Sequence, residues 1–265
     1  MTLHYAPNLT MLYTEVPLLA RFARAAASGF TAVEVQFPYE AGIENVKGRL
    51  DETGLRLVLF NLPPGDTAAG ELGTLSNPAR RDYFRQSFET ALTAAVHLNC
   101  TQLNTLFGQK VPELDPAAQI ECAVENLAWA VPLAAQAGVT LLLEPLNFVD
   151  WPHFFLHHTA TAVEVVTAVG QPQVKVQYDV YHAQMAEGNL INTITTFFPH
   201  IGHIQIADVP GRHEPGTGEI NYPAIFAALE KLNYSGYIGL EYKPSSTTEA
   251  SLDWLPREAR QSRPE

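Results

Sequence analysis

Short apolar runs recur along the whole chain, and each is followed by a longer stretch in which apolar residues return every three or four positions. The first pattern is typical of β-strands and the second of amphipathic α-helices. We predict strands at residues 3–9, 32–37, 55–62, 101–107, 141–144, 174–179, 201–205 and 237–241. We predict helices at residues 15–28, 42–53, 78–98, 116–137, 159–169, 190–198, 222–232 and 247–255.

The alternation of strand and helix predicts how the chain is organised. Capping residues precede proline at Asn77-Pro78 and Asp115-Pro116, and glycines stand where helices should end, as at Gly54 and Gly138. Eight strand–helix repeats favour a parallel sheet closed into a (β/α)8 TIM barrel. We find no linker, low-complexity tract or block of charge, so we expect a single domain over residues 1–265, with a frayed tail after about residue 256.

Composition narrows the classes of partner. The chain has 265 residues and a net charge of −12, which disfavours non-specific binding to nucleic acid or to an anionic membrane. A small anionic substrate would need only a local cationic pocket. Cys100 and Cys122 are isolated and fit reduced thiols, the first residues lack a secretory pattern, and no apolar run reaches the ~18 residues of a membrane span. We expect a cytoplasmic protein.

Four predicted strands in the second half of the chain carry a metal-ligand type of residue at or near their ends: Glu144, Asp179, Gln205 and Glu241. Taken singly, such a residue is as often a helix cap or a paired surface charge. In a parallel barrel, however, these strand ends meet at the rim that holds the active site. Three carboxylates and an amide at that rim predict a site for Mg²⁺ or Mn²⁺.

A cation held in this way keeps open positions for a substrate that chelates through adjacent oxygens, as an α-hydroxy carbonyl compound does. Glu144 and Glu241, on the fifth and eighth strands, are the better placed pair for moving a proton between two neighbouring carbons. We therefore predict proton removal beside a carbonyl, an enediolate, and proton return to the adjacent carbon. No glycine-rich phosphate-binding motif appears, so no nucleotide cofactor is expected.

Further polar residues near the same rim are candidates for substrate binding. His182 follows Asp179 by three positions, Lys243 follows Glu241 by two, and Arg212 lies in the long connection 209–221. Each has an ordinary alternative, a helix cap for the histidine and a surface ion pair for the two cations. We favour Lys243 and His182 over Arg212 as direct substrate ligands. The connections 63–77 and 209–221 are rich in Gly and Pro and are expected to act as lids or binding loops.

The chain resembles the hydroxypyruvate isomerase family in several long motifs. They are Leu143-Glu144-Pro145-Leu146-Asn147, Gln177-Tyr178-Asp179-Val180-Tyr181-His182, and residues 6–12, 61–66, 202–208, 212–222 and 239–244. The resemblance implies a xylose isomerase-like TIM barrel in which Glu144 and Glu241 are the acid/base pair. It implies Glu144, Asp179, Gln205 and Glu241 as metal ligands, Asn61 beside the substrate, and interconversion of hydroxypyruvate with 2-hydroxy-3-oxopropanoate.

One departure leaves the substrate open. Phe60 precedes Asn61, whereas hydroxypyruvate isomerases carry His at that position. In having Phe there, the chain resembles the related 2-oxo-tetronate isomerases. Ketose 3-epimerases share the carboxylates but carry His in place of Gln205. A metal-dependent phosphodiesterase or endonuclease would need clustered His ligands and a basic track, and a non-catalytic sugar-binding barrel remains a third alternative. The aromatic run 151–155 is expected to wall the pocket or to support a homo-oligomer.

Overall fold

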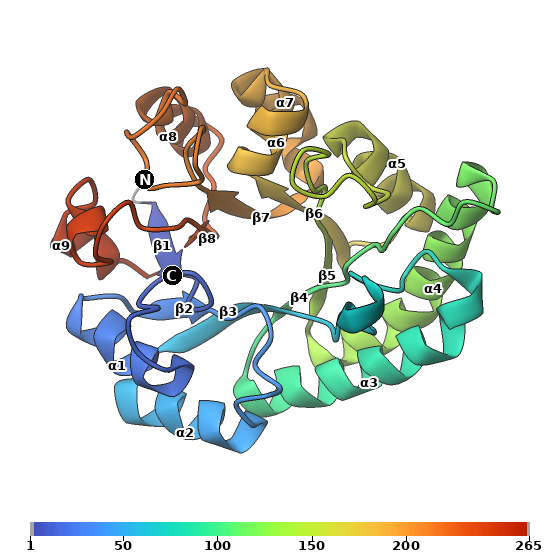
Figure 1. Cartoon of the computed structure of the whole chain (residues 1–265), viewed down its shortest axis with the longest axis horizontal. Helices are drawn as coiled ribbons and strands as arrows, with labels where there is room; N and C mark the ends of the chain where they lie inside the picture. The colour runs from blue at the N-terminus through green and yellow to red at the C-terminus, as the bar shows by residue number, and fades with distance from the viewer. Residues whose placement is uncertain (1–2, 264–265) are drawn as a thin grey trace.

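The computed structural model describes residues 3–263, and its centre is a ring of eight parallel strands surrounded by helices (Figure 1). The predicted TIM barrel is confirmed. Consecutive strands pair from β2 round to β8, and β8 pairs with β1. The strands are β1 (His4–Pro7), β2 (Ala32–Glu34), β3 (Arg56–Asn61), β4 (Gln102–Asn104), β5 (Thr140–Leu143), β6 (Val174–Asp179), β7 (Ile201–Ile206) and β8 (Tyr237–Leu240).

The ring closes between β1 and β2 by a single bridge at the ends of these strands. Asn8 pairs with Glu34, and the backbone N–H of Leu9 donates to the carbonyl of Glu34 at 2.8 Å. The side chains of Asn8 and Glu34 are both buried. The seam therefore places a carboxylate inside the barrel, close to the rim where the other strands end.

Nine α-helices and four 3₁₀ turns occur within residues 3–263. The α-helices are α1 (Leu18–Ala27), α2 (Ile43–Thr53), α3 (Arg81–Leu98), α4 (Pro116–Ala137), α5 (Thr159–Val169), α6 (Val180–Ala186), α7 (Leu190–Phe197), α8 (Tyr222–Lys231) and α9 (Arg257–Arg260). The turns are η1 (Thr67–Ala69), η2 (Pro78–Arg80), η3 (Phe198–His200) and η4 (Ala250–Leu252). The predicted bounds of α4 and α5 are confirmed. Helix α4 begins where the Asp115 carboxylate accepts the N–H of Ala117 and ends at left-handed Gly138.

Two local predictions need correction. The helix expected at 247–255 is wrong, because only η4 forms there: Thr248 binds the backbone of Tyr13 and the carboxylate of Glu15, which holds the segment as turns. Helix α6 was not predicted. It begins directly after Asp179, whose carboxylate accepts the N–H of Tyr181 at 2.8 Å.

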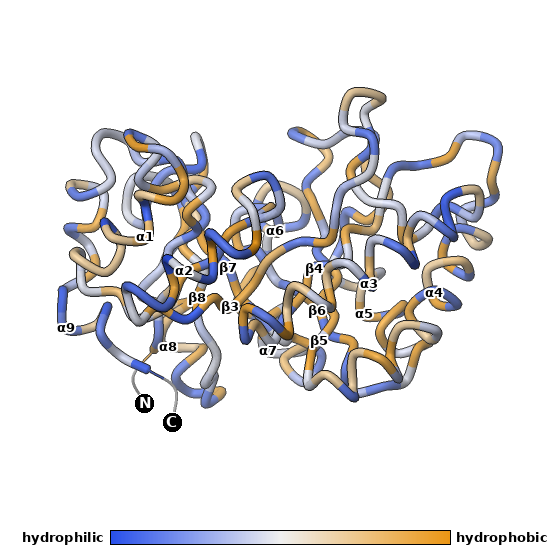
Figure 2. Tube along the Cα trace, turned by 90° about the horizontal axis from the view of Figure 1, so that it is seen from below, coloured by the Kyte–Doolittle hydropathy of each residue, from blue (hydrophilic) through white to orange (hydrophobic). Residues whose placement is uncertain are grey.

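The C-terminal tail, expected to be frayed, packs against the start of the chain. Helix α9 carries Arg260, whose guanidinium donates to the carbonyls of Leu252 and Leu255, and the hydroxyl of Ser262 donates to the carbonyl of Leu3 at 2.9 Å. Residues 264 and 265 of the predicted tail lie outside the described residues. The first and last described segments of the chain thus lie side by side at one end of the barrel (Figure 2). Within residues 3–263, no helix is long and apolar enough to cross a membrane.

Candidate active site

The four predicted ligand residues lie at the carboxyl ends of adjacent or nearby strands. Glu144 directly follows β5, Asp179 ends β6, Gln205 lies near the end of β7, and Glu241 directly follows β8. All four side chains are buried. Glu144, Gln205 and Glu241 line one small cavity, which Asn61 and Phe60 also line. The register of the parallel strands brings these residues together, since their ends meet at one rim.

Arg212 lies between the carboxylates. Its Nη2 is 3.3 Å from Oδ2 of Asp179 and 3.1 Å from Oε1 of Glu241, and its guanidinium lies 4.9 Å above the ring of Tyr181. Arg212 reaches this place because its backbone is left-handed, with φ of 59°, in the connection after β7. A planar guanidinium can bind two carboxylates and stack on an aromatic ring at once, which an ammonium group cannot do.

The electrostatics of the site leave negative charge uncompensated. Burial, followed by the charges of Glu241 and Asp179, raises the pKa of Glu144 well above its usual range. Burial likewise raises the pKa of Asp179, although the charge of Arg212 opposes the shift. Burial raises the pKa of Glu241 to about 8, again against Arg212. Three buried carboxylates share one guanidinium, so a further cation would stabilise the ionised site.

His182 faces the carboxylates as a neutral hydrogen-bond donor. The backbone N–H of Asn147 lies 3.1 Å from Nδ1 of His182, and an N–H can only donate, so Nδ1 accepts. Burial, followed by the charge of Arg212, lowers the pKa of His182 well below its usual range, so the ring is neutral. A neutral ring that accepts at Nδ1 carries its proton on Nε2, which lies 3.8 Å from Oδ2 of Asp179.

The residues fit a metal site. Glu144, Asp179 and His182 each offer one ligand atom, and these atoms all lie within 4.8 Å of one another. All three side chains are buried. The protonated Nε2 of His182 is a poor metal ligand, so the two carboxylates are the better donors for a hard divalent cation.

The chain is similar to known proteins over nearly its whole length. The sequence model described as xylose isomerase-like TIM barrel matches residues 22–258. The chain belongs to this family. Hydroxypyruvate isomerase of Escherichia coli (strain K12) is 44% identical to it over 254 residues, covering 96% of this chain and 98% of that protein. The 2-oxo-tetronate isomerase of Cupriavidus necator is 43% identical over 251 residues, covering 95% and 96%. The resemblance seen in the motifs is thereby confirmed, and the chain is a sugar-acid isomerase of the xylose isomerase-like family.

Solved structures share the fold of this chain. A Brucella melitensis structure described as AP endonuclease, family 2, is 42% identical, has a TM-score of 0.93, and covers 96% of this chain and 98% of that one. D-Psicose 3-epimerase of Clostridium cellulolyticum H10, solved with D-tagatose, has a TM-score of 0.75 at 19% identity and covers 98% and 96%. At that identity the likeness shows the fold alone.

Two predicted substrate-binding residues, Asn61 and Lys243, lie in different surroundings. Asn61 is buried at the cavity wall, and its carbonyl accepts from the hydroxyl of Tyr39. Lys243 is exposed, and its backbone N–H, not its side chain, contacts the carbonyl of Arg212 at 2.7 Å. The sequence favoured Lys243 over Arg212 as a direct ligand, whereas the structure places Arg212 beside the carboxylates.

Sequence reasoning missed several polar residues of the site. Asn104, at the end of β4, donates to Oε2 of Glu144 at 2.7 Å, and Gln36 donates to Oε1 of Glu241 at 2.6 Å. Glu34 and His203 are buried and lie 2.6 Å apart, between Oε1 and Nε2. The signal was present in the apolar run 32–37, where Glu34 and Gln36 are the polar exceptions. Strands in the first half of the chain therefore contribute to the site as well.

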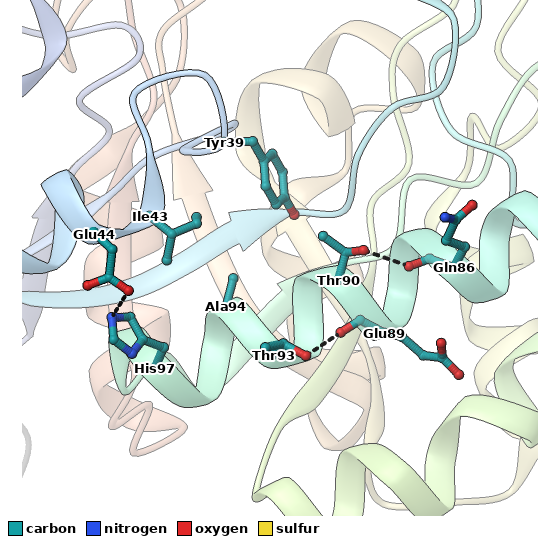
Figure 3. A pocket seen from close by; sticks show the side chains of 9 residues that line it. All are labelled: Tyr39, Ile43, Glu44, Gln86, Glu89, Thr90, Thr93, Ala94 and His97. Carbon is teal, nitrogen blue, oxygen red and sulfur yellow. Dashed lines mark hydrogen bonds and ion pairs between the residues drawn. The ribbon is translucent and has the colours of Figure 1, made fainter.

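A wider hollow lies elsewhere on the barrel, between α2 and α3 (Figure 3). Its wall includes Glu44 and His97, whose side chains are 3.2 Å apart, and Thr90 and Thr93, whose hydroxyls bond to the backbone of α3. None of its lining residues is one of the carboxylates described above. The hollow is a groove between helices and does not belong to the acidic site.

Proposed function

We propose that the protein interconverts hydroxypyruvate and 2-hydroxy-3-oxopropanoate with the help of Mg²⁺ or Mn²⁺. The observation that carries the proposal is the pair Glu144 and Glu241: two buried carboxylates with raised pKa that line one small cavity from β5 and β8. An acid/base group works best when its pKa lies near the working pH, and the pKa of Glu241 is raised to about 8. The likeness to hydroxypyruvate isomerase at 44% identity supports the same reaction.

The reaction needs one proton to leave C3 of hydroxypyruvate and one to reach C2. One carboxylate of the pair takes the proton from C3, and the electrons of the broken C–H bond form the C2–C3 double bond of an enediolate. The other carboxylate, in its acid form, returns a proton to C2. The hydroxyl proton at C3 moves to the oxygen at C2, which leaves an aldehyde at C3 and an alcohol at C2. A divalent cation held by Glu144, Asp179, Gln205 and Glu241 would supply polarisation of the two substrate oxygens.

Neighbouring residues would hold the substrate. The Nε2–H of His182 is directed toward the carboxylates and would donate to a substrate oxygen. Arg212 would bind the substrate carboxylate by its guanidinium fork, which matches a carboxylate in shape and charge. Asn61 contributes an amide to the cavity wall. Lys243, exposed at the rim, would attract the anionic substrate to the site.

A second candidate is 2-oxo-tetronate isomerase activity, with the same carboxylates and a four-carbon substrate. The observation that favours it is Phe60, which is fully buried and lines the cavity in place of a polar residue. The likeness to the Cupriavidus necator enzyme at 43% identity supports it as well. An endonuclease, suggested by the description of the Brucella melitensis structure, is disfavoured because the net charge is −12 and the metal-type group contains two carboxylates.

Proton exchange followed by NMR in D₂O tests the proposal. Purified protein with Mn²⁺ would be given hydroxypyruvate, 2-oxo-tetronate and a free ketose in parallel. We expect deuterium at C3 of hydroxypyruvate, loss of exchange with EDTA, and a fall of about 10²–10⁴-fold in Glu144→Gln and Glu241→Gln. Exposed Glu44→Gln is the matched control and should keep full exchange. Exchange in the four-carbon acid alone would assign 2-oxo-tetronate as the substrate. No exchange in any compound would overturn the isomerase mechanism.

Two further properties belong to the proposal. Exposed apolar side chains at Phe148, Val149 and Trp151 favour self-association as a homo-oligomer. Cys100 and Cys122 are free and buried, as suits a cytoplasmic protein. Light scattering at several protein concentrations would report the mass, and a monomer at every concentration would contradict self-association.

A further inference from the structure

Glu34 is a fully buried carboxylate that none of the steps above uses. It ends β2, at the seam of the barrel, and both of its oxygens are occupied. Oε1 lies 2.6 Å from Nε2 of His203. Oε2 accepts from Nε2 of Gln205 at 2.8 Å and from the amide of Asn8 at 3.4 Å. A buried carboxylate is costly unless it is bonded in this way, which indicates that this carboxylate has a specific task.

A carboxylate can only accept hydrogen bonds, so Glu34 determines which end of the Gln205 amide faces it. The nitrogen of Gln205 must turn toward Glu34, and its oxygen must turn away. That oxygen, Oε1, accepts from Nε2 of Gln177 at 2.6 Å. The amide of Gln177 is therefore oriented as well, and its own oxygen is the last acceptor in this series of hydrogen bonds.

The last oxygen in this series of hydrogen bonds has no partner among residues 3–263. Within the part of the protein that the structure describes, Oε1 of Gln177 is buried and makes no hydrogen bond, although the residue lines the same cavity as Glu144 and Glu241. A buried acceptor without a donor is rare in a folded protein. It marks a position in the cavity where a donor from a bound molecule would be accommodated.

The absence of a side chain at Gly239 independently supports a specific arrangement of Glu34 and Gln205. A Cβ at this position of β8 would lie 2.3 Å from Oε1 of Glu34 and 2.7 Å from Cγ of Gln205. Any side chain at 239 would therefore displace the Glu34–Gln205 pair. Glycine at this position of β8 leaves the space that the side chains of Glu34 and Gln205 fill.

We propose that Glu34 is a positioning residue that fixes the polarity of Gln205 and Gln177, so that two amide oxygens face the site. The oxygen of Gln205 would be one of the oxygens that hold the divalent cation, and the oxygen of Gln177 would accept from a substrate hydroxyl. This inference rests on the proposed function. Without Glu34, nothing distinguishes the two ends of either amide, and a flipped Gln205 would present N–H groups to a cation.

Metal binding measures this role without relying on turnover. Metal-free protein would be titrated with Mn²⁺, and free Mn²⁺ would be followed by electron paramagnetic resonance. We expect Glu34→Gln to weaken Mn²⁺ binding about 10–100-fold, the usual effect of losing a residue that orients a ligand. Glu187→Gln, which removes a hydrogen-bonded carboxylate beside Thr159, is the control and should bind Mn²⁺ as the parent does. A purely structural role would lower the melting temperature and leave Mn²⁺ affinity unchanged, and that result would overturn the inference.

Gly239→Ala keeps every ionisable group and answers the same question if Glu34→Gln does not fold. We expect the added methyl group to displace the pair and to weaken Mn²⁺ binding by a similar factor. Mn²⁺ affinity within twofold of the parent in the folded variant would overturn the inference. If the parent isomerises its substrate and Glu34→Gln binds Mn²⁺ normally, the inference alone fails. If the parent neither binds Mn²⁺ nor exchanges protons, the proposed function fails, and the inference fails with it.

Discussion

Arg212 is a cation in direct contact with two buried carboxylates, and its shape matters as much as its charge. It contacts Asp179 and Glu241 while it lies over the ring of Tyr181. Arg212→Lys keeps the charge but loses the planar fork. We expect kcat/KM to fall about 10–100-fold, mainly through a higher KM, since a hydrogen bond to a charged group contributes about 1.5–3 kcal/mol. Steady-state kinetics beside exposed Arg49→Lys would show this, and equal KM values would contradict a role in substrate binding.

A substitution at Gln177 would distinguish binding of the substrate from binding of the metal. Gln177→Leu removes the unpartnered oxygen but leaves Gln205 anchored to Glu34. We expect KM to rise about fivefold, which corresponds to the ~1 kcal/mol of one hydrogen bond, while Mn²⁺ affinity stays within about threefold. Kinetics and Mn²⁺ titration on the same preparation would measure both. An unchanged KM would show that no substrate hydroxyl bonds to Gln177.

At the scale of elements, Asp208 ties together the two ends of the connection after β7. The buried carboxylate of Asp208 accepts four backbone N–H groups, from Val209, Gly216, Gly218 and Ile220. Asp208→Ala would leave these donors without their partner, at about 1–3 kcal/mol for each one that stays buried. We expect faster hydrogen exchange across 209–221 and lower activity, because Arg212 lies in this connection. Peptides from α4 should be unaffected, and unchanged exchange in 209–221 would contradict the prediction.

The same elements show how far the sequence predicts the structure. Strand ends follow from local apolar patterns, and for that reason Glu144, Asp179 and Glu241 could be placed on one rim before the fold was known. The position of Arg212 could not, because it depends on a left-handed backbone and on the hydrogen bonds by which Asp208 holds the connection 209–221. Glu34 was missed because its partners His203 and Gln205 come from β7, across the barrel interior. Pairing between elements depends on the assembled barrel, which local patterns do not contain.

At the scale of the whole molecule, the buried carboxylates link stability to pH. Folding raises the pKa of Glu241 from an ordinary 4.5 to about 8, and it also raises the pKa of Glu144 and Asp179. Between these pKa values the folded protein holds a proton that the unfolded chain has lost. The stability that these protons supply is therefore present below about pH 4.5 and is lost as the pH rises toward 8.

Melting temperatures in EDTA, measured from pH 7 to pH 8, would test this linkage, because the lowered pKa of His182 adds a slope of the opposite sign below pH 7. We expect the metal-free protein to melt at lower temperature as the pH rises. Its free energy of unfolding should fall by up to about 1.4 kcal/mol per pH unit for each retained proton. Mn²⁺ competes with these protons for the same oxygens, so its stabilising effect should grow with pH and flatten the curve. Glu241→Gln cannot titrate and should remove its share of the slope in EDTA. A metal-free melting temperature that stays level or rises toward pH 8 would contradict the protons assigned to the folded carboxylates.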